Sequence, residues 1–582
     1  MNTIKFRIIK KKDLFYRIGY ALCCLCIVYF NLINIGKLTA PSILFDEFGY
    51  LATGALFAGR DWSEVISKCS VPYYSYGYGF IISFILRAIS TPELAYQVLI
   101  LLNVMMTCAM LFLSNYVCKA FICNKEFRLI VCGAACFFPG IIHNTQFAWT
   151  EILLTFLFWL ALALFKKILD GGNVFVSAAL GVTVCYIYIV HQRGVGLLGV
   201  SVIMIILLYI LNIVSKKQLF TFLIVIGTCI FFHMCIKEYV KEFLWTNDYI
   251  LDEKVYTNDY AGQIQKIKFL FSFEGIKCFV LGILGKLFYF GLCSFFLGFE
   301  GIYFTICKSK ELIGNILNKK NVSVNHETEY LSLFILLSFA STLIISTIFH
   351  IYPSRIDAVM YGRYTDWVVI IFIVMGLYNI KVSGVNLIRF SEYLFSSLIF
   401  LLVFNNLIQS YGLWLNFSSC SPITFLYRNI MCNCEVEWVT VMFLISIFLS
   451  IGLWRCFLSK KNKTYYLGLI FMILLWIFIT NPAIKNDIEL SNRKDVKSIV
   501  EVIHEENNGG TVYYVLEEGK ECLFIACVQY LLGAQEIQVV DIEQLKEIKH
   551  GLILLNKNFN IDEIEMECSL IKSLELCDIY KY

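Results

Sequence analysis

The chain has 582 residues, of which 59% are hydrophobic and 16% are charged, and its formal net charge is +4. Soluble domains contain about 45–50% apolar and about 25% charged residues, so this composition excludes a soluble globular protein and a disordered one. The charge balance also excludes a nucleic-acid-binding protein with a basic face. The sequence therefore predicts a polytopic membrane protein.

The first apolar stretch, 18–35, follows a basic N-terminal segment. Lysine and arginine are enriched on the cytoplasmic side of membrane helices, so this segment predicts a cytoplasmic N-terminus. Because no small-x-small cleavage site follows, we interpret the stretch as a retained membrane helix and not a signal peptide. The basic residues are Lys5, Arg7, Lys10, Lys11, Lys12 and Arg17.

A long external loop, 36–93, is expected next. Its apolar run, 80–89, is shorter than the roughly 20 residues that a spanning helix needs, so we expect it to lie at the membrane interface. The rest of the membrane region predicts further helices, for a total of about thirteen spans. The expected spans are 94–117, a return to about 143, 151–165, spans ending near 191, 216 and 237, then 288–304, one ending near 352, and 366–380, 393–407, 438–457 and 465–478.

The composition changes after Asn481. Residues 492–506 have the pattern of an amphipathic helix, and three short segments have the pattern of buried strands. The sequence thus predicts an all-α polytopic membrane module, 1–481, followed by a small external α/β domain, 482–582, that stabilises the protein or binds a partner. The expected strands are 511–516, 537–540 and 551–555.

Five groups of ionisable residues converge on the external face from separate loops. Ionisable groups at membrane depth are costly, and they usually mark a functional path. The groups are Asp46–Glu47 with Tyr50, Arg60–Asp61, Glu151, His191–Gln192–Arg193, and Arg355–Asp357 with Arg363–Asp366.

The acids of these groups have both functional and structural interpretations. Asp46 and Glu47 are flanked by Phe45 and Phe48, and an apolar wall can raise the pKa of a carboxylate toward that of a general base. Two carboxylates can also hold a divalent metal ion. Alternatively, Asp46 caps a helix, and Glu151 complements a helix dipole from the first turn.

The basic residues also leave two interpretations open. A guanidinium in a short turn, such as Arg193, can bind a phosphate with two hydrogen bonds, or it can reach lipid head groups. Arg363 can contact a second phosphate oxygen or pair with Asp366 one helical turn later. His191 can bind substrate or pack at the interface. The tyrosines between 73 and 78 can stack on a sugar ring or form an interfacial aromatic belt.

In combination, these residues resemble the glycosyltransferase C superfamily, in its protein-mannosyltransferase and aminoarabinose-transferase-like branch (glycosyltransferase family 39-like). The first external loop of that branch carries Asp-Glu with Tyr three residues on, as in Asp46-Glu47-Phe48-Gly49-Tyr50. An acid opens its fourth span, an arginine lies between its fifth and sixth spans, and an Arg-Tyr pair opens a late span. The matching residues are Glu151, Arg193 and Arg363-Tyr364. The chain departs from the many relatives with Pro-Pro before the interfacial helix, since it has Tyr76-Gly77-Tyr78-Gly79 at this position.

The lysine-rich loops and the lack of a eukaryotic retrieval signal favour a bacterial plasma-membrane protein. The resemblance implies an enzyme that transfers a sugar from a polyprenyl-phosphate donor to an acceptor hydroxyl on the external face, with inversion. Asp46 would be the general base, and Arg193 and Arg363 would bind the donor phosphate. Glu47 and Glu151 would orient the acceptor, tune Asp46 or hold a divalent metal ion, for which Asp46 and Glu151 are the candidate ligands. The implied substrate-binding residues are Tyr50, Tyr74, Tyr76, His191 and Tyr364.

The implied partners are the lipid-linked donor, an acceptor that is a protein, lipid or cell-wall polymer, and membrane lipids, with no nucleic acid. A transporter or flippase of a lipid-linked glycan is the alternative function, and a polymerase or ligase of surface polysaccharide is a third. A transporter should show two related halves with broken helices near the midplane. The sequence shows no such repeat, and its charges lie at the external face.

Overall fold

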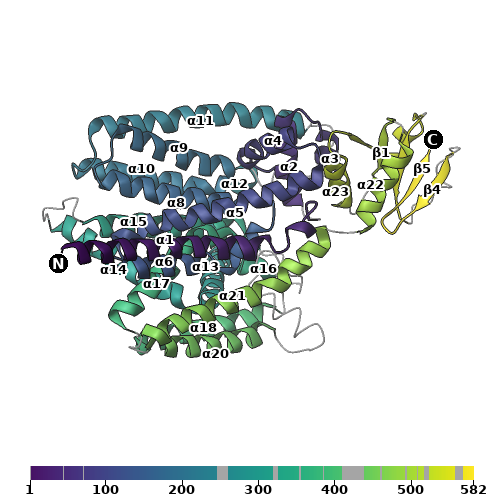
Figure 1. The fold of residues 1–582 in the computed structure, drawn as a ribbon. Helices are drawn as coiled ribbons and strands as arrows, with labels where there is room; N and C mark the ends of the chain where they lie inside the picture. Colours follow the sequence, from purple (N-terminus) through teal and green to yellow (C-terminus); the bar gives the residue numbers. More distant parts are fainter. Residues whose placement is uncertain are drawn as a thin grey trace.

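The computed structural model has two parts, a long bundle of helices and a small sheet with its own helices at one end (Figure 1). The start of the chain and the C-terminal strands lie at opposite ends of the molecule. The described residues are 2–42, 45–69, 71–245, 260–318, 326–352, 356–384, 386–408, 438–458, 462–491, 494–507, 509–516, 523–548, 550–557 and 568–582.

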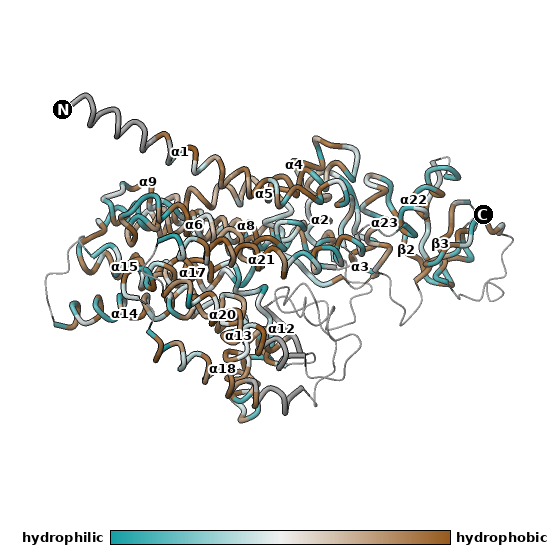
Figure 2. Tube along the Cα trace, turned by 60° about the horizontal axis from the view of Figure 1, so that its bottom comes forward, coloured by the Kyte–Doolittle hydropathy of each residue, from teal (hydrophilic) through white to brown (hydrophobic). Residues whose placement is uncertain are grey.

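Most bundle helices are long and apolar, as the brown segments of Figure 2 show. Among the described residues, nine helices are long and apolar enough to cross a membrane, or up to ten if one bent pair counts as a span. The chain is therefore an integral membrane protein, as predicted, but the expected count of about thirteen spans is not confirmed. The long bundle helices are α1 (Asn2–Leu32), α5 (Pro92–Val117), α8 (Thr150–Leu169), α9 (Val174–Val190), α10 (Val195–Ile210), α11 (Lys216–Leu244), α13 (Phe273–Cys293), α14 (Leu297–Leu317), α15 (Glu327–Phe349), α17 (Arg363–Ser383), α18 (Leu387–Ile408), α20 (Trp438–Leu458) and α21 (Asn462–Ser491).

Successive helices alternate in direction. Glu151 lies in the first turn of α8 and Lys166–Lys167 in its last turn, and α9 returns to His191. Helix α10 runs away from this end of the bundle, and α11 runs back to it. The carbonyl of Leu244, the last residue of α11, accepts a hydrogen bond of 2.8 Å from the Ser67 hydroxyl. Glu151 and His191 therefore lie at the same end of the bundle as the loop 36–93. The side of the membrane on which this end lies stays a prediction.

The third expected span is bent, not straight. Helices α6 (Lys125–Ala135) and α7 (Pro139–Thr145) meet at an angle of 60°. Pro139 accounts for the break, because proline lacks a backbone N–H and disfavours helical backbone at the preceding residue. Phe138 accordingly has a ψ of 136°, outside the helical range.

The expected span 288–304 is wrong, because the chain turns inside it. Helix α13 ends at Cys293 and α14 begins at Leu297. Between them, Phe295 and Phe296 have φ angles of 51° and 61°, which place both residues in the left-handed region. Both side chains are buried, so apolar packing accompanies this turn and hydropathy alone does not reveal it.

The loop 36–93 folds into three short helices that carry part of the site. They are α2 (Phe45–Ala58), α3 (Ser63–Lys68) and α4 (Gly77–Ala88). Gly49 allows the segment that carries Tyr74 to pass close to α2, since a Cβ at position 49 would lie 2.1 Å from Cδ2 of Tyr74. The short apolar run is helical, as α4, and its location at the membrane interface stays a prediction.

The C-terminal region contains a five-stranded sheet in the order β2-β1-β3-β5-β4. Strands β2, β1 and β3 are parallel, whereas β5 pairs antiparallel with β3 and β4. The predicted fold class, a helical membrane protein with a small α/β domain, is confirmed. The elements are α22 (Lys494–Glu506), β1 (Val512–Val515), α23 (Leu523–Leu532), β2 (Ile537–Val540), α24 (Ile542–Leu545), β3 (Leu552–Asn556), β4 (Ser569–Ser573) and β5 (Cys577–Lys581).

This α/β region packs on the loop 36–93, where Figure 1 shows α23 beside α3. The indole of Trp62 donates a hydrogen bond to the Gly533 carbonyl at 2.9 Å, and Lys68 donates to the Val539 carbonyl at 2.7 Å. Helix α21 continues past residue 481 to Ser491, and the domain division at that residue stays a prediction.

Candidate active site

A cavity of about 200 Å³ lies among the loop 36–93, the α9–α10 turn and the adjoining ends of α15 and α17. Its lining combines charged and aromatic side chains with aliphatic ones. The lining residues are Asp46, Tyr50, Tyr73, Tyr74, Ser75, His191, Gln192, Arg193, Val195, Gln263, Ile267, Ile345, Ile348, Phe349, Arg363 and Tyr364.

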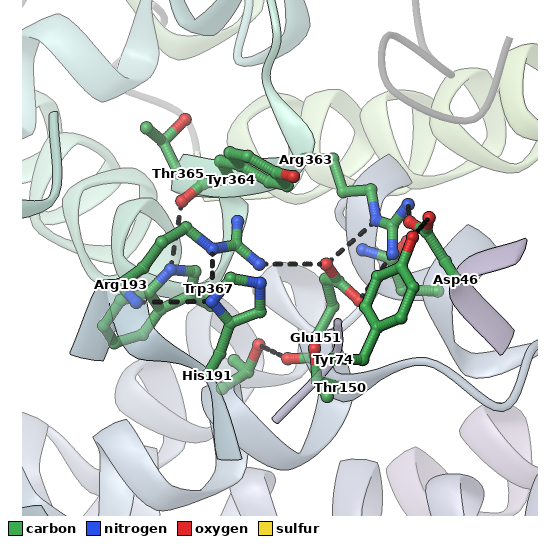
Figure 3. Close-up of polar contacts among 12 residues, drawn as sticks. Asp46, Tyr74, Thr150, Glu151, His191, Arg193, Arg363, Tyr364, Thr365 and Trp367 are labelled. Atoms are coloured by element: carbon green, nitrogen blue, oxygen red, sulfur yellow. Dashed lines mark hydrogen bonds and ion pairs between the residues drawn. The ribbon is translucent and has the colours of Figure 1, made fainter. Parts of the chain in front are cut away.

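Asp46 lies in the first turn of α2, and its side chain is 29% exposed. Its Oδ1 accepts a hydrogen bond of 2.6 Å from the Tyr74 hydroxyl, and its Oδ2 lies 2.8 Å from Nη1 of Arg363 (Figure 3). These two contacts fix the orientation of the carboxylate. Each carboxylate oxygen has two lone pairs, so Asp46 retains the capacity to accept a further proton or hydrogen bond.

Arg363 connects Asp46 to Glu151, which is almost fully buried in the first turn of α8. Its Nε lies 2.9 Å from Oε1 of Glu151, and its Nη2 lies 3.4 Å from Oε2. The guanidinium carbon is 4.1 Å from the centre of the Trp149 ring, a cation–π contact. Glu151 thus holds Arg363 in one orientation across the cavity.

Arg193, in the short turn between α9 and α10, contacts the same carboxylate from the other side. Its Nη2 lies 3.3 Å from Oε1 of Glu151, and its guanidinium stacks 3.5 Å from the centre of the Tyr364 ring. Its Nη1 is buried and has no hydrogen-bond partner among the described residues. A buried donor normally finds a partner, so this nitrogen marks a place where an anionic ligand would be stabilised.

His191 accepts hydrogen bonds at Nδ1 from Nε of Arg193 at 3.1 Å and from its backbone N–H at 3.3 Å. Burial, and then the positive charges of Arg193 and Arg363, hold the pKa of His191 well below its usual value of 6.5. The imidazole is therefore neutral at physiological pH, with its proton on Nε2. The charges of the cluster then come from two carboxylates and two guanidiniums, which balance.

Glu47 does not line the cavity, although it follows Asp46 directly. Its carboxylate is fully buried and accepts hydrogen bonds from the Ser42 backbone and hydroxyl, the Ala148 backbone and the Tyr96 hydroxyl. Burial raises the pKa of Glu47, and these hydrogen bonds act against that rise. The arrangement is suited to holding loops together.

The acids of the site do not form a ligand set for a divalent metal ion. Asp46 and Glu151 face the same guanidinium, that of Arg363, which already occupies the position between them. The described part of the chain also contains no group of three or more His, Cys, Asp or Glu residues that could hold a metal.

Most of the predicted site residues meet at this cavity, and a few do not. Glu47 lies outside it, and Tyr76 also lies outside, with its hydroxyl 3.1 Å from Nδ1 of His233. Arg363 pairs with Asp46 and Glu151, whereas Asp366 accepts a hydrogen bond of 3.2 Å from Tyr289. Arg355, from the same predicted group, lies outside the described residues. The lining residues that the sequence analysis named as site residues are Asp46, Tyr50, Tyr74, His191, Arg193, Arg363 and Tyr364, and Glu151 binds both arginines.

In the Arg60–Asp61 group, both side chains bond to the backbone within the loop 36–93. Arg60 donates to the Leu86 carbonyl at 2.7 Å, and Asp61 accepts from the Ser63 N–H at 2.9 Å. Neither residue lines the cavity. This pair therefore fits a structural role better than a functional one.

Sequence analysis did not identify the Trp149 ring or the apolar wall of the cavity. Trp149 lies two residues before Glu151, so its closeness in sequence to a predicted site acid could have identified it. The wall consists of residues from α10, α12 (Tyr260–Leu270) and α15, and its sequence resembles that of any lipid-facing helix. The wall residues are Val195, Ile267, Ile345, Ile348 and Phe349.

Comparison with solved structures finds a similar fold in ArnT from Cupriavidus metallidurans. Its apo structure matches with a TM-score of 0.54 and 8% sequence identity, over 98% of each chain. Its structure bound to undecaprenyl phosphate matches with a TM-score of 0.52 and 8% identity, over 97% of this chain and 98% of that one. No protein-family model matches the chain, and no curated protein matches its sequence. At this identity the likeness concerns the fold alone, so the chain has an ArnT-like fold.

Proposed function

We propose that the protein is a membrane glycosyltransferase that moves a sugar from a polyprenyl-phosphate donor to an acceptor hydroxyl on the external face of the membrane. One observation carries the proposal: a single cavity brings the Asp46 carboxylate together with two buried arginines and an apolar wall. The fold supports it, because ArnT, which shares this fold, has been captured with undecaprenyl phosphate.

The cavity suits a ligand that is charged at one end and apolar at the other. Arg193 and Arg363 supply guanidinium groups for a phosphate, and Nη1 of Arg193 is available for it. Ile345, Ile348 and Phe349 supply a surface for an isoprenoid chain. Guanidinium binds phosphate through paired, charge-assisted hydrogen bonds, and an isoprenoid chain favours an apolar surface.

In the proposed reaction, the oxygen of the acceptor hydroxyl attacks the anomeric carbon of the donor sugar. The bond between that carbon and the phosphate oxygen breaks, and its electron pair stays on the phosphate. The hydroxyl proton passes to Asp46, which acts as a general base. A single displacement of this kind inverts the configuration at the anomeric carbon.

The two arginines would act on the leaving group. The phosphate gains a negative charge as the bond breaks, so contacts from Arg193 and Arg363 stabilise the transition state more than the bound donor. Glu151 keeps both guanidiniums in place before the donor arrives. Tyr50, Tyr74 and Tyr364 border the space where the sugar would lie.

The location and partners are proposed on the same basis. The basic turns favour a cytoplasmic N-terminus, so the cavity and the α/β region would lie outside the cytoplasm of a bacterial cell. The acceptor would be a protein, a lipid or a cell-wall polymer that carries a free hydroxyl.

Sugar transfer in proteoliposomes tests the proposal. Wild-type protein would be given a panel of radiolabelled polyprenyl-phosphate sugars with crude envelope acceptors, and the anomeric configuration of the product would be determined by NMR. Transfer with inversion from at least one donor is the expected result. Movement of the labelled lipid across the bilayer without transfer would overturn the proposal and favour a flippase.

A further inference from the structure

Glu47 joins the two segments that carry the acids of the site. Its Oε2 accepts hydrogen bonds of 2.6 Å from the backbone and from the hydroxyl of Ser42, just before α2. Its Oε1 accepts a hydrogen bond of 2.9 Å from the backbone of Ala148, just before α8. Because Asp46 starts α2 and Glu151 starts α8, the Glu47 carboxylate fixes the spacing between these two acids.

We call the contacts of Glu47 with Ser42 and Ala148 the Glu47 junction. The α/β region contacts this junction through Tyr530, a residue of α23 that is buried and does not line the cavity. The Tyr530 ring packs edge-on against Tyr96, whose hydroxyl donates to Oε1 of Glu47, with ring centres 6.1 Å apart. The Tyr530 hydroxyl donates a hydrogen bond of 2.8 Å to the Pro92 carbonyl at the start of α5.

The Tyr530 ring also contacts α2 through a second set of aromatic residues. Tyr530 packs edge-on against Trp62, again with ring centres 6.1 Å apart. Trp62 stacks on Phe48, with ring centres 5.6 Å apart, and Phe48 follows Glu47 in the first turns of α2. Tyr530 thus supports the start of α2 from two sides through aromatic contacts.

We propose that the C-terminal α/β region is a positioning element of the active site, and that Tyr530 fixes the start of α2, which carries Asp46, through Tyr96–Glu47 and Trp62–Phe48. Its catalytic consequence rests on the proposed function, because it concerns the rate of sugar transfer. Its structural consequence, order at the Glu47 junction, does not depend on that function.

This arrangement predicts that loss of the Tyr530 ring lowers the rate of sugar transfer but leaves donor binding almost unchanged. Glu151 and Tyr364 hold Arg193, and Glu151, Trp149 and Asp46 hold Arg363. The direct contacts of Tyr530 involve none of these residues. Loss of the Tyr530 ring should therefore displace Asp46 more than the arginines, because Arg193 keeps Glu151 and Tyr364 and Arg363 keeps Glu151 and Trp149. Displacement of a reacting group by about 1 Å can lower a rate about 100-fold.

The test compares Tyr530→Ala, Tyr530→Phe and the control Tyr580→Ala in full-length protein in proteoliposomes. Tyr580 lies in β5, where its ring packs against a separate cluster of the sheet. Three quantities are measured: kcat for sugar transfer, the Kd and stoichiometry for undecaprenyl phosphate, and hydrogen exchange at the Ser42 and Ala148 amides.

For Tyr530→Ala we expect kcat to fall by about tenfold or more, Kd and stoichiometry to stay within about twofold, and exchange at both amides to become faster. Tyr530→Phe keeps the ring, and Tyr580→Ala leaves the junction intact, so both should behave like wild type. Unchanged exchange at Ser42 and Ala148 in Tyr530→Ala would overturn the inference. A parallel loss of kcat and binding stoichiometry would also overturn it, because it would show a general loss of folded protein. If wild type transfers no sugar, the proposed function fails, and the exchange data still test the positioning role.

Discussion

Nε of Arg363 lies 2.9 Å from Oε1 of Glu151, and both side chains are only 2% exposed. The partners come from different helices, α17 and α8, and the same carboxylate also binds Arg193. A buried charge is tolerated when it is paired, and its partner becomes costly when the pair is broken. Glu151 is therefore the group that allows two arginines to remain buried next to the cavity.

Glu151→Gln should destabilise the protein by about 3 kcal/mol, because two buried guanidiniums lose their shared negative partner. The measurement is thermal unfolding in detergent, with and without undecaprenyl phosphate. Added lipid phosphate should raise the Tm of the variant more than that of wild type, since it restores a negative charge. An unchanged Tm without lipid would show that the ion pairs of Glu151 with the two arginines contribute nothing to stability.

Arg193→Lys should weaken donor binding about tenfold, or about 1.4 kcal/mol, since an ammonium cannot donate the paired hydrogen bonds of a guanidinium. Arg60→Lys is the matched control, because Arg60 bonds to the Leu86 carbonyl away from the cavity. Binding of undecaprenyl phosphate to the two variants is compared. Equal affinity in both would remove Arg193 from the phosphate site.

The pH dependence of stability should contain a contribution from His191. Because the folded state lowers the pKa of His191 below 6.5, the unfolded chain binds more protons as the pH falls through this value. Stability is therefore full above about pH 6.5 and decreases by up to about 1.4 kcal/mol per pH unit below it, until the folded imidazole itself is protonated. Chemical denaturation at about pH 7 and about pH 5 should show a smaller decrease for His191→Asn than for wild type. Identical pH profiles would contradict the prediction.

Gly49→Ala should lower both stability and transfer, because its Cβ would lie 2.1 Å from Cδ2 of Tyr74, the residue that donates to Asp46. Overpacking of this kind costs about 1–3 kcal/mol. Gly199→Ala is the control, since no heavy atom lies within 4 Å of the added Cβ. A Gly49→Ala variant with wild-type Tm and turnover would show that this close approach is not required.

The sequence predicts the elements whose hydropathy pattern is regular and misses those that depend on local backbone or burial. Helix α5 and strand β2 lie almost where the periodicity places them. The turn at Phe295–Phe296 lies inside an apolar run, so no polar residue marks it. Strand β4 has mostly exposed residues and lacks the alternation that indicates a strand.

Within the site, charged residues are easy to find because they are rare in an apolar chain, but the direction of each side chain is harder to predict. Asp46 and Glu47 are adjacent on α2, and successive helical residues point about 100° apart. One therefore faces the cavity and the other faces the junction with Ala148, which only the packing of α2 decides. The apolar wall could not be predicted, because lipid-facing and cavity-facing isoleucines have the same sequence signature.

Single-turnover transfer by Asp46→Asn, compared with Asp61→Asn, tests the central claim most directly. Asp61 is an acid in the same loop, 36–93, that accepts a hydrogen bond from the Ser63 N–H and does not line the cavity. We expect Asp46→Asn to bind undecaprenyl phosphate normally and to transfer sugar about 100-fold to 10,000-fold more slowly, since it cannot accept the hydroxyl proton. Asp61→Asn should transfer at the wild-type rate. Transfer by Asp46→Asn at the rate of Asp61→Asn would contradict the assignment of Asp46 as the general base.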